Sequence, residues 1–196
     1  MDKNTFYIYS YTFLYSICEN TLPFHWGINF YFRILQMNNS VRIINSELIN
    51  DVRDKALNAP RKRLNYNFHQ LDETYQRFLN ILCKGTYVRP HRHTTPPKAE
   101  TFLILEGKIS FLIFSEEGNV IESHILEAGG PNYGIDILPG IWHSLVCISE
   151  TAVCFEGKHG PYNPASDKDF AEWAPHENTK EAIEYLVSLE NKIKYQ

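Results

Sequence analysis

The sequence predicts a mainly β domain, a sandwich or barrel, with one helix before it and one after it. Between Gln76 and Glu156, short runs rich in β-branched and aromatic residues alternate with turn residues, and no helical pattern interrupts them. On either side of this region, apolar residues recur at helical spacing, from Ser46 to Ala59 and over about 178–194. Neither internal repeats nor low-complexity tracts complicate this arrangement.

Composition excludes several classes of partner. The chain has 196 residues, 43% of them hydrophobic and 21% charged, which suits one globular domain. A formal net charge of -4 offers no basic surface for nucleic acid or for anionic lipid, so we expect no nucleic-acid partner and no membrane partner for residues 37–196. Cys18, Cys83, Cys147 and Cys154 form no C-x-x-C pair, which favours reduced thiols and a cytoplasmic location.

Residues 1–36 differ from the rest of the chain. They hold 11 of its 27 aromatic residues and four charged side chains. Polar residues interrupt their apolar stretches, which argues against a signal peptide, and the stretch Tyr7–Ile17 is too short to cross a membrane. We therefore expect an over-called translation start and a single working domain at 37–196, beginning at Met37. An aromatic segment lying on a membrane surface is the alternative.

Local signals place the ends of the two helices. Ser46 is the expected N-cap of the first helix, and Pro60 ends its apolar pattern. Asn178, with Glu181 three residues later, resembles a capping box at the start of the last helix. Between the first helix and the β region, we expect Arg61–Gln70 to be a polar connector.

Four residues have the pattern of a metal site. On a strand, residues two apart point to the same face, so His91 and His93 should project together. Glu100 begins the next predicted strand, and His143 follows the turn at Pro139-Gly140. Three imidazoles and one carboxylate suit a divalent transition metal, and we expect Zn, Fe, Mn, Ni or Co, with no other cofactor.

The spacing of these residues resembles the paired motifs of the cupin superfamily. The first motif reads G-x5-H-x-H-x6-E-x6-G from Gly85 to Gly107, and the second reads P-G-x-x-H from Pro139 to His143. The separation of His93 from Glu100 is longer than in the common pattern. The resemblance implies a cupin double-stranded β-helix, a jelly-roll barrel, whose four ligands converge on a metal inside the barrel.

A narrower resemblance, to the WbuC family of cupin-fold metalloproteins, extends over most of Met37–Pro175. It implies a bacterial cytoplasmic protein in O-antigen and surface-polysaccharide metabolism, including lipopolysaccharide biosynthesis. The matching segments are Arg63-x-Asn65, His69, Gln76-Arg77, Tyr87 to His93, Glu100-Thr101-Phe102, Pro139 to His143, Phe155-Glu156, Gly160-Pro161-Tyr162, Asp167 to Phe170 and Trp173-Ala174-Pro175.

Two functions from different classes fit these residues. The first is a metal-dependent enzyme that acts on a small, carbohydrate-derived or anionic substrate, of isomerase, epimerase or lyase type, or an oxygenase if the metal is iron. The second is a non-catalytic, metal-dependent sugar-binding or sensing module. The absence of an obvious acid/base pair in the motifs keeps the second hypothesis open, and either protein could form a homodimer.

Tyr87, Arg89 and His69 are the further candidates for catalysis. If His91 and His93 face the barrel interior, Tyr87 and Arg89 share that face by period two, and Arg89 could hold a carboxylate, phosphate or sugar hydroxyl. The alternative for Arg89 is a strand-end side chain that reaches solvent. His69, with Asn65, could cover the barrel mouth, although a packing role fits both residues as well.

The irregular segment after Glu156 allows two interpretations. Gly160-Pro161-Tyr162 and Asp167–Asp169 could form a lid over the barrel, or a strap that holds the last helix. Glu156 and Lys158 are first of all candidates for a structural ion pair.

Overall fold

The computed structural model describes residues 41–194. The expectations for residues 1–36, including their dispensability and the start at Met37, lie outside the described residues. The chain from Ile44 onward forms one compact unit that contains the helices and strands below.

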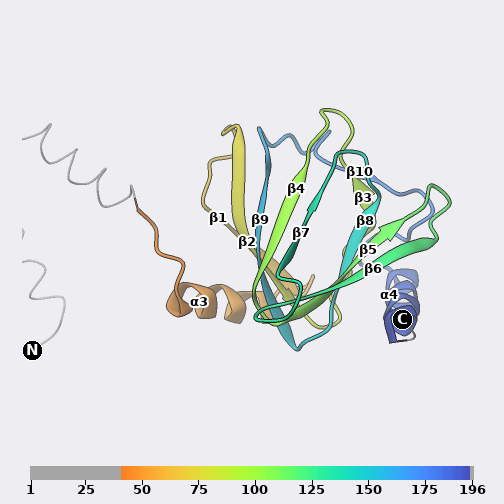
Figure 1. Ribbon diagram of the computed structural model, residues 1–196, viewed down its shortest axis with the longest axis horizontal. Coiled ribbons are helices and arrows are strands. Elements are labelled where there is room, and N and C mark those ends of the chain that lie inside the picture. The colour runs from red at the N-terminus through yellow and green to blue at the C-terminus, as the bar shows by residue number, and fades with distance from the viewer. Residues whose placement is uncertain (1–40, 195–196) are drawn as a thin grey trace, which may run out of the picture. The chain divides into compact units, whose positions relative to one another are not determined.

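Ten strands form two antiparallel sheets of five strands each, with α3 before them and α4 after them (Figure 1). The first sheet has the order β1-β2-β9-β4-β7, and the second has the order β10-β3-β8-β5-β6. The elements are α3 (Ser46–Leu57), β1 (Arg63–Asn67), β2 (Tyr75–Cys83), β3 (His91–Arg92), β4 (Glu100–Glu106), β5 (Lys108–Phe114), β6 (Val120–Glu127), β7 (Gly134–Ile137), β8 (His143–Cys147), β9 (Thr151–His159), β10 (Asp169–Phe170) and α4 (Lys180–Lys194).

The chain passes back and forth between the two sheets. Strands β2, β4, β7 and β9 lie in the first sheet, and the strands between them in sequence, β3, β5, β6 and β8, lie in the second. This alternation closes a jelly roll with one interior. The predicted fold class, a cupin double-stranded β-helix with a helix at each end, is confirmed.

Strand β4 illustrates how the sequence builds the interior. Glu100, Phe102 and Ile104 are buried, while Thr101 and Leu103 between them are exposed, as the period of two requires. Gly107 then turns the chain into β5 with φ +75, where a Cβ would meet the Thr151 carbonyl oxygen. The apolar residues packed around this interior include Leu82, Phe102, Ile109, Phe111, Leu126, Leu145 and Cys154.

Helix α3 packs its apolar face on the outside of the first sheet, against β2 and β9. Its N-cap is Asn45, whose side chain accepts a hydrogen bond from Leu48 N at 2.9 Å, so the assignment to Ser46 was wrong by one residue. Helix α4 packs on the second sheet, and Thr179 Oγ1 accepts from Ala182 N at its start. The capping box expected at Asn178 was therefore also wrong. Neither described helix has the length and apolarity needed to cross a membrane.

Two segments differ from the sequence expectation. The connector Arg61–Gln70 contains β1, which pairs along its whole length with β2. Conversely, residues 86–90 do not form a strand, and β3 includes only His91 and Arg92. Pro90 explains this boundary because it has no backbone N–H to donate to a neighbouring strand.

The packing of α4 gives a test of the fold. Leu189 is 1% exposed, so replacing it with alanine should leave a cavity and lower the free energy of unfolding by about 2–5 kcal/mol. Ile183, in the same helix, is 66% exposed, and Ile183→Ala should change that free energy by less than about 0.5 kcal/mol. Urea unfolding of both variants makes the comparison, and equal losses would contradict the packing described here.

Candidate metal centre

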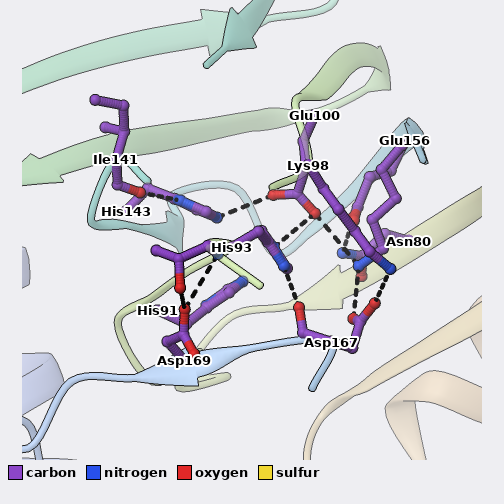
Figure 2. Close-up of polar contacts among 12 residues, drawn as sticks. Asn80, His91, His93, Lys98, Glu100, Ile141, His143, Glu156, Asp167 and Asp169 are labelled. Atoms are coloured by element: carbon purple, nitrogen blue, oxygen red, sulfur yellow. Dashed lines mark hydrogen bonds and ion pairs between the residues drawn. The ribbon is translucent and has the colours of Figure 1, made fainter. Parts of the chain in front are cut away.

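His91, His93, Glu100 and His143 come together in the barrel interior (Figure 2). All four are buried, and the atoms with which they could bind an ion lie within 4.8 Å of one another. The ring centroid of His143 lies 4.4 Å from that of His91 and 5.9 Å from that of His93. The structure thus brings together all four residues that the sequence pattern selected.

The two sheets contribute to the cluster unequally. His91 in β3 lies directly opposite His143 in β8, so both imidazoles leave the second sheet on the same face. Glu100 starts β4 and faces them from the first sheet. Phe111 stacks on the His143 ring with a centroid distance of 5.6 Å and an interplanar angle of 13°. The cluster is therefore held between the sheets and supported on one side by an aromatic ring.

Backbone carbonyls fix the tautomer of each histidine. His91 Nδ1 lies 2.9 Å from the Arg89 carbonyl oxygen, and His143 Nδ1 lies 2.9 Å from that of Ile141. His93 Nδ1 makes the equivalent contact with the Asp167 carbonyl oxygen. A carbonyl only accepts hydrogen bonds, so each Nδ1 must carry the proton and each Nε2 of a neutral ring keeps its lone pair. This is the arrangement that metal-binding histidines adopt.

The atoms that face one another lack hydrogen-bond partners. His93 Nε2 lies 3.0 Å from Glu100 Oε1, and His143 Nε2 lies 3.1 Å from Glu100 Oε2. Neither contact has hydrogen-bond geometry, and both Nε2 atoms and Glu100 Oε2 remain buried without a partner. Lone pairs of neutral imidazoles placed this close to a carboxylate repel it. A cation among them would satisfy every one of these atoms, so the donor set fits a divalent metal.

The charge state of the cluster agrees with this geometry. Burial, followed by the positive charge of Lys168, holds the pKa of His91 well below its usual range. Burial alone would raise the pKa of Glu100, but hydrogen bonds that His143 and His93 donate when their Nε2 is protonated, together with the charge of Lys158, outweigh it. The pKa of that carboxyl lies well below its usual range, so a neutral imidazole and an ionised carboxylate are available together.

A network of ion pairs formed by Lys158, Lys98 and Asp167 contacts the cluster at Glu100. Lys158 Nζ lies 3.3 Å from Glu100 Oε1 and 3.0 Å from Asp167 Oδ2. Lys98 Nζ lies 2.9 Å from Asp167 Oδ1 and donates to the Pro161 carbonyl at 3.0 Å. Both lysines and Asp167 are buried. The expected ion pair of Lys158 with Glu156 is thus replaced by pairs with Glu100 and Asp167.

Glu156 lies on the inner face of β9, two residues before Lys158 and therefore closer to the apolar core. It pairs across the sheet with Phe78 on one side and Phe102 on the other, and Asn80 Nδ2 donates to its Oε2 at 3.1 Å. Burial raises the pKa of Glu156 to about 7, and the charge of Glu100 acts in the same direction. This carboxyl can therefore exchange a proton near neutral pH.

Tyr87 and Arg89 do not share the histidine face, and the argument from strand parity was wrong. Residues 86–90 are not a strand, so the period of two does not extend back across Pro90. Tyr87 packs with the apolar residues beneath α4, and its hydroxyl donates to the Pro175 carbonyl at 3.0 Å. The Arg89 guanidinium donates to the Ala171 carbonyl at 2.7 Å and contacts His176. Its role as an anion-holding residue stays an untested prediction.

His69 is buried beside β2, where its Nδ1 accepts from Arg77 N at 3.0 Å. Its ring centroid is 6.0 Å from that of Phe78, so it packs against the sheet that carries Glu156. Asn65 is exposed on β1. These contacts give His69 a packing role, and a catalytic role for it is untested.

Sequence reasoning missed Lys98, Asp167 and Lys168 as neighbours of the cluster. Lys98 precedes the strand that Glu100 begins, and period two from Glu100 could have placed it on the inner side. Asp167 and Lys168 lie in the irregular segment after β9, where no periodicity indicates direction. Asp169, next to them, accepts from Thr94 N at 3.1 Å, so this segment is a strap tied to the barrel.

Fold and donor set together define a cupin-fold protein with a buried three-histidine, one-glutamate cluster that can hold a metal ion. The family model "Domain of unknown function (DUF6016)" matches residues 44–126, which is less than half of the chain. No sequence among the curated proteins matches this chain.

Solved structures similar to this chain include cupins and a protein of polysaccharide assembly. The capsular polysaccharide assembling protein CapF from Staphylococcus aureus is 21% identical with a TM-score of 0.47, over 56% of this chain and 32% of that one. An RmlC-like cupin with a double-stranded β-helix fold from Methanocaldococcus jannaschii is 14% identical, with a TM-score of 0.40, over 50% and 81%. The cupin domain of Schizosaccharomyces pombe Cnp3 is 14% identical, with a TM-score of 0.39, over 50% and 61%. This chain therefore spans about a third of the CapF chain.

Glu156 gives the site a testable pH dependence. A raised pKa means that folding favours the protonated acid, so this residue contributes stability below its unfolded pKa of about 4.3, and that contribution is lost as the pH rises through about 7. In metal-free protein, the free energy of unfolding of wild type minus that of Glu156→Gln should fall by roughly 3 kcal/mol between pH 5 and pH 8.

Urea unfolding at several pH values in the presence of a chelator measures this difference, and subtraction removes the titrations that both proteins share. Glu150, whose side chain is 87% exposed, provides the control variant Glu150→Gln, for which the difference should stay flat. Parallel stability curves for wild type and Glu156→Gln would contradict the raised pKa.

Proposed function

We propose that this protein binds one divalent transition metal through His91, His93, Glu100 and His143 and acts as a metal-dependent enzyme on a small, carbohydrate-derived substrate. The observation that carries the metal site is the set of Nε2 lone pairs that face an ionised carboxylate without any proton between them. When bound, the ion would supply Lewis acidity to a carbonyl or hydroxyl oxygen of the substrate.

Residues of the chain would supply the remaining functions. Lys158, buried between Glu100 and Asp167, keeps the Glu100 carboxylate ionised and fixed in position. Glu156 is the acid/base group that the sequence motifs did not reveal, because its pKa of about 7 lets it take up or release a proton at neutral pH. Proton transfer of this kind supports isomerisation, epimerisation or elimination. Glu156 thus favours the enzyme over the non-catalytic sugar-binding module.

The biological setting follows from the resemblance of the sequence motifs to the WbuC family. We place the protein in the bacterial cytoplasm, in O-antigen and surface-polysaccharide metabolism. Zn, Fe, Mn, Ni and Co all accept three imidazoles and a carboxylate.

Metal content is the first test. Protein purified without a polyhistidine tag should contain about one transition-metal ion per chain. The double variant His91→Ala/His93→Ala should lose it, because two of the three imidazoles are gone. His124, a partly exposed histidine that contacts Glu122 outside the cluster, provides the control His124→Ala, which should keep its metal. Elemental analysis of the three proteins decides, and a double variant with stoichiometric metal would refute the site.

A ligand screen separates the enzyme from the binding module. Nucleotide sugars and free sugar acids are tested for thermal stabilisation of the metal-loaded protein, since a ligand at 100 times its Kd stabilises the folded state by about 2.7 kcal/mol. Each stabilising compound is then incubated with the protein and examined by NMR. Conversion by wild type, with its loss in Glu156→Gln at unchanged metal content, supports the enzyme; binding without conversion supports the module.

A further inference from the structure

Lys168 lies beside the histidine cluster, in a segment whose neighbouring residues contact two of the histidines. In the pairing of β10 with β3, Phe170 is opposite His91, and the two ring centroids are 6.1 Å apart. On the other side of Lys168, the Asp167 carbonyl oxygen contacts His93 Nδ1. Lys168 therefore lies in the chain between two residues that contact the histidines, and its positive charge lowers the pKa of His91.

Lys168 differs from the two other lysines of the site in having no partner. Lys98 and Lys158 are both buried and both paired with Asp167. The carboxylate of the neighbouring residue Asp169 accepts hydrogen bonds from the backbone N–H and the hydroxyl of Thr94. Lys168 is partly buried, and among residues 41–194 no acceptor forms a hydrogen bond or ion pair with its amine.

The charges around the cluster leave one positive charge uncompensated. Lys98 and Lys158 share the carboxylates of Glu100 and Asp167, and neither of these carboxylates forms an ion pair with Lys168. A divalent ion bound by the cluster would increase the excess of positive charge. Burial and the charge of Lys158 already lower the pKa of Lys168. An anion beside Lys168 would offset both effects.

An unpaired polar atom on β2 points to the rest of the ligand. Gln76 lies opposite Lys158 on the inner face and is 1% exposed, yet its Nε2 has no partner. A buried amide of this kind normally makes hydrogen bonds, and a hydroxyl group of a ligand would supply the acceptor.

We propose that Lys168 binds the anionic group of a small hydroxylated ligand, a carboxylate or phosphate, beside the histidine cluster, while Gln76 binds one of its hydroxyl groups. This inference rests on the proposed function, since it names the substrate class of the same site. It also assigns to Lys168 the anion-holding role that the sequence suggested for Arg89.

The test uses the full-length chain loaded with Co²⁺. Wild type, Lys168→Gln and the control Lys192→Gln, at an exposed position of α4, are titrated with D-gluconate, D-glucose 6-phosphate and D-glucose by calorimetry. We expect at least one of the two anions to bind wild type more tightly than glucose does. Loss of one charge-assisted hydrogen bond should weaken the binding of that anion about 10- to 100-fold in Lys168→Gln. Cobalt content should not change, and Lys192→Gln should behave as wild type.

A preference for gluconate identifies a carboxylate, and a preference for the sugar phosphate identifies a phosphate. Equal anion affinity in Lys168→Gln and wild type would overturn the inference, and so would glucose binding as tightly as the anions or failure of both anions to bind. Lys168→Met replaces the glutamine variant if that protein does not fold. If wild type takes up no Co²⁺, the proposed function fails, and the same titrations on metal-free protein decide whether Lys168 binds anions.

Discussion

The site depends on one ionised carboxylate that faces the lone pairs of neutral imidazoles in the buried interior of the barrel. Glu100 reaches this space from one sheet, and His91 and His143 reach it from the other, so the cluster exists only when the jelly roll closes. Backbone carbonyls hold every Nδ1–H, which removes the protons that could otherwise lie between nitrogen and carboxylate. The fold thus maintains an arrangement that is unfavourable until a cation binds.

Rows of side chains across the first sheet divide the interior into layers. Gln76, Lys158 and Glu100 lie side by side on β2, β9 and β4 and form a polar row at the level of the cluster. The next row toward the core places Glu156 between two phenylalanines, Phe78 and Phe102. A carboxyl between aromatic rings is poorly solvated, which explains the raised pKa of Glu156, whereas Glu100, one row away, gains charged and polar neighbours. Glu100 and Glu156 lie in adjacent rows of the same sheet, yet the pKa of Glu100 is lowered and that of Glu156 is raised.

The sequence predicted which residues meet in the cluster because His91 and His93 are two residues apart and because Glu100 and His143 follow them in the order of the cupin motifs. The succession of short strands predicted the barrel, whereas metal binding by the cluster stays a prediction. The same reasoning failed for Tyr87 and Arg89 because Pro90 ends the strand, and parity has no meaning on irregular backbone. Lys168 and Asp167 could not be placed because their segment takes its direction from contacts with β3 and with Lys98, which are remote in sequence.

Asp167 connects the strap to both halves of the site. Its backbone carbonyl accepts from His93, which belongs with the second sheet, while its carboxylate holds Lys158 and Lys98 on the side of the first sheet. Through Lys158 it also fixes Glu100, so one residue outside the barrel motifs controls the position of a histidine and of the carboxylate that faces it. Lys168 follows Asp167 in the chain, so the contacts that hold Asp167 also fix the backbone position of Lys168. An anion bound by Lys168 would therefore act on a segment that already positions two of the four cluster residues, which couples occupancy of the ligand site to the geometry of the metal centre.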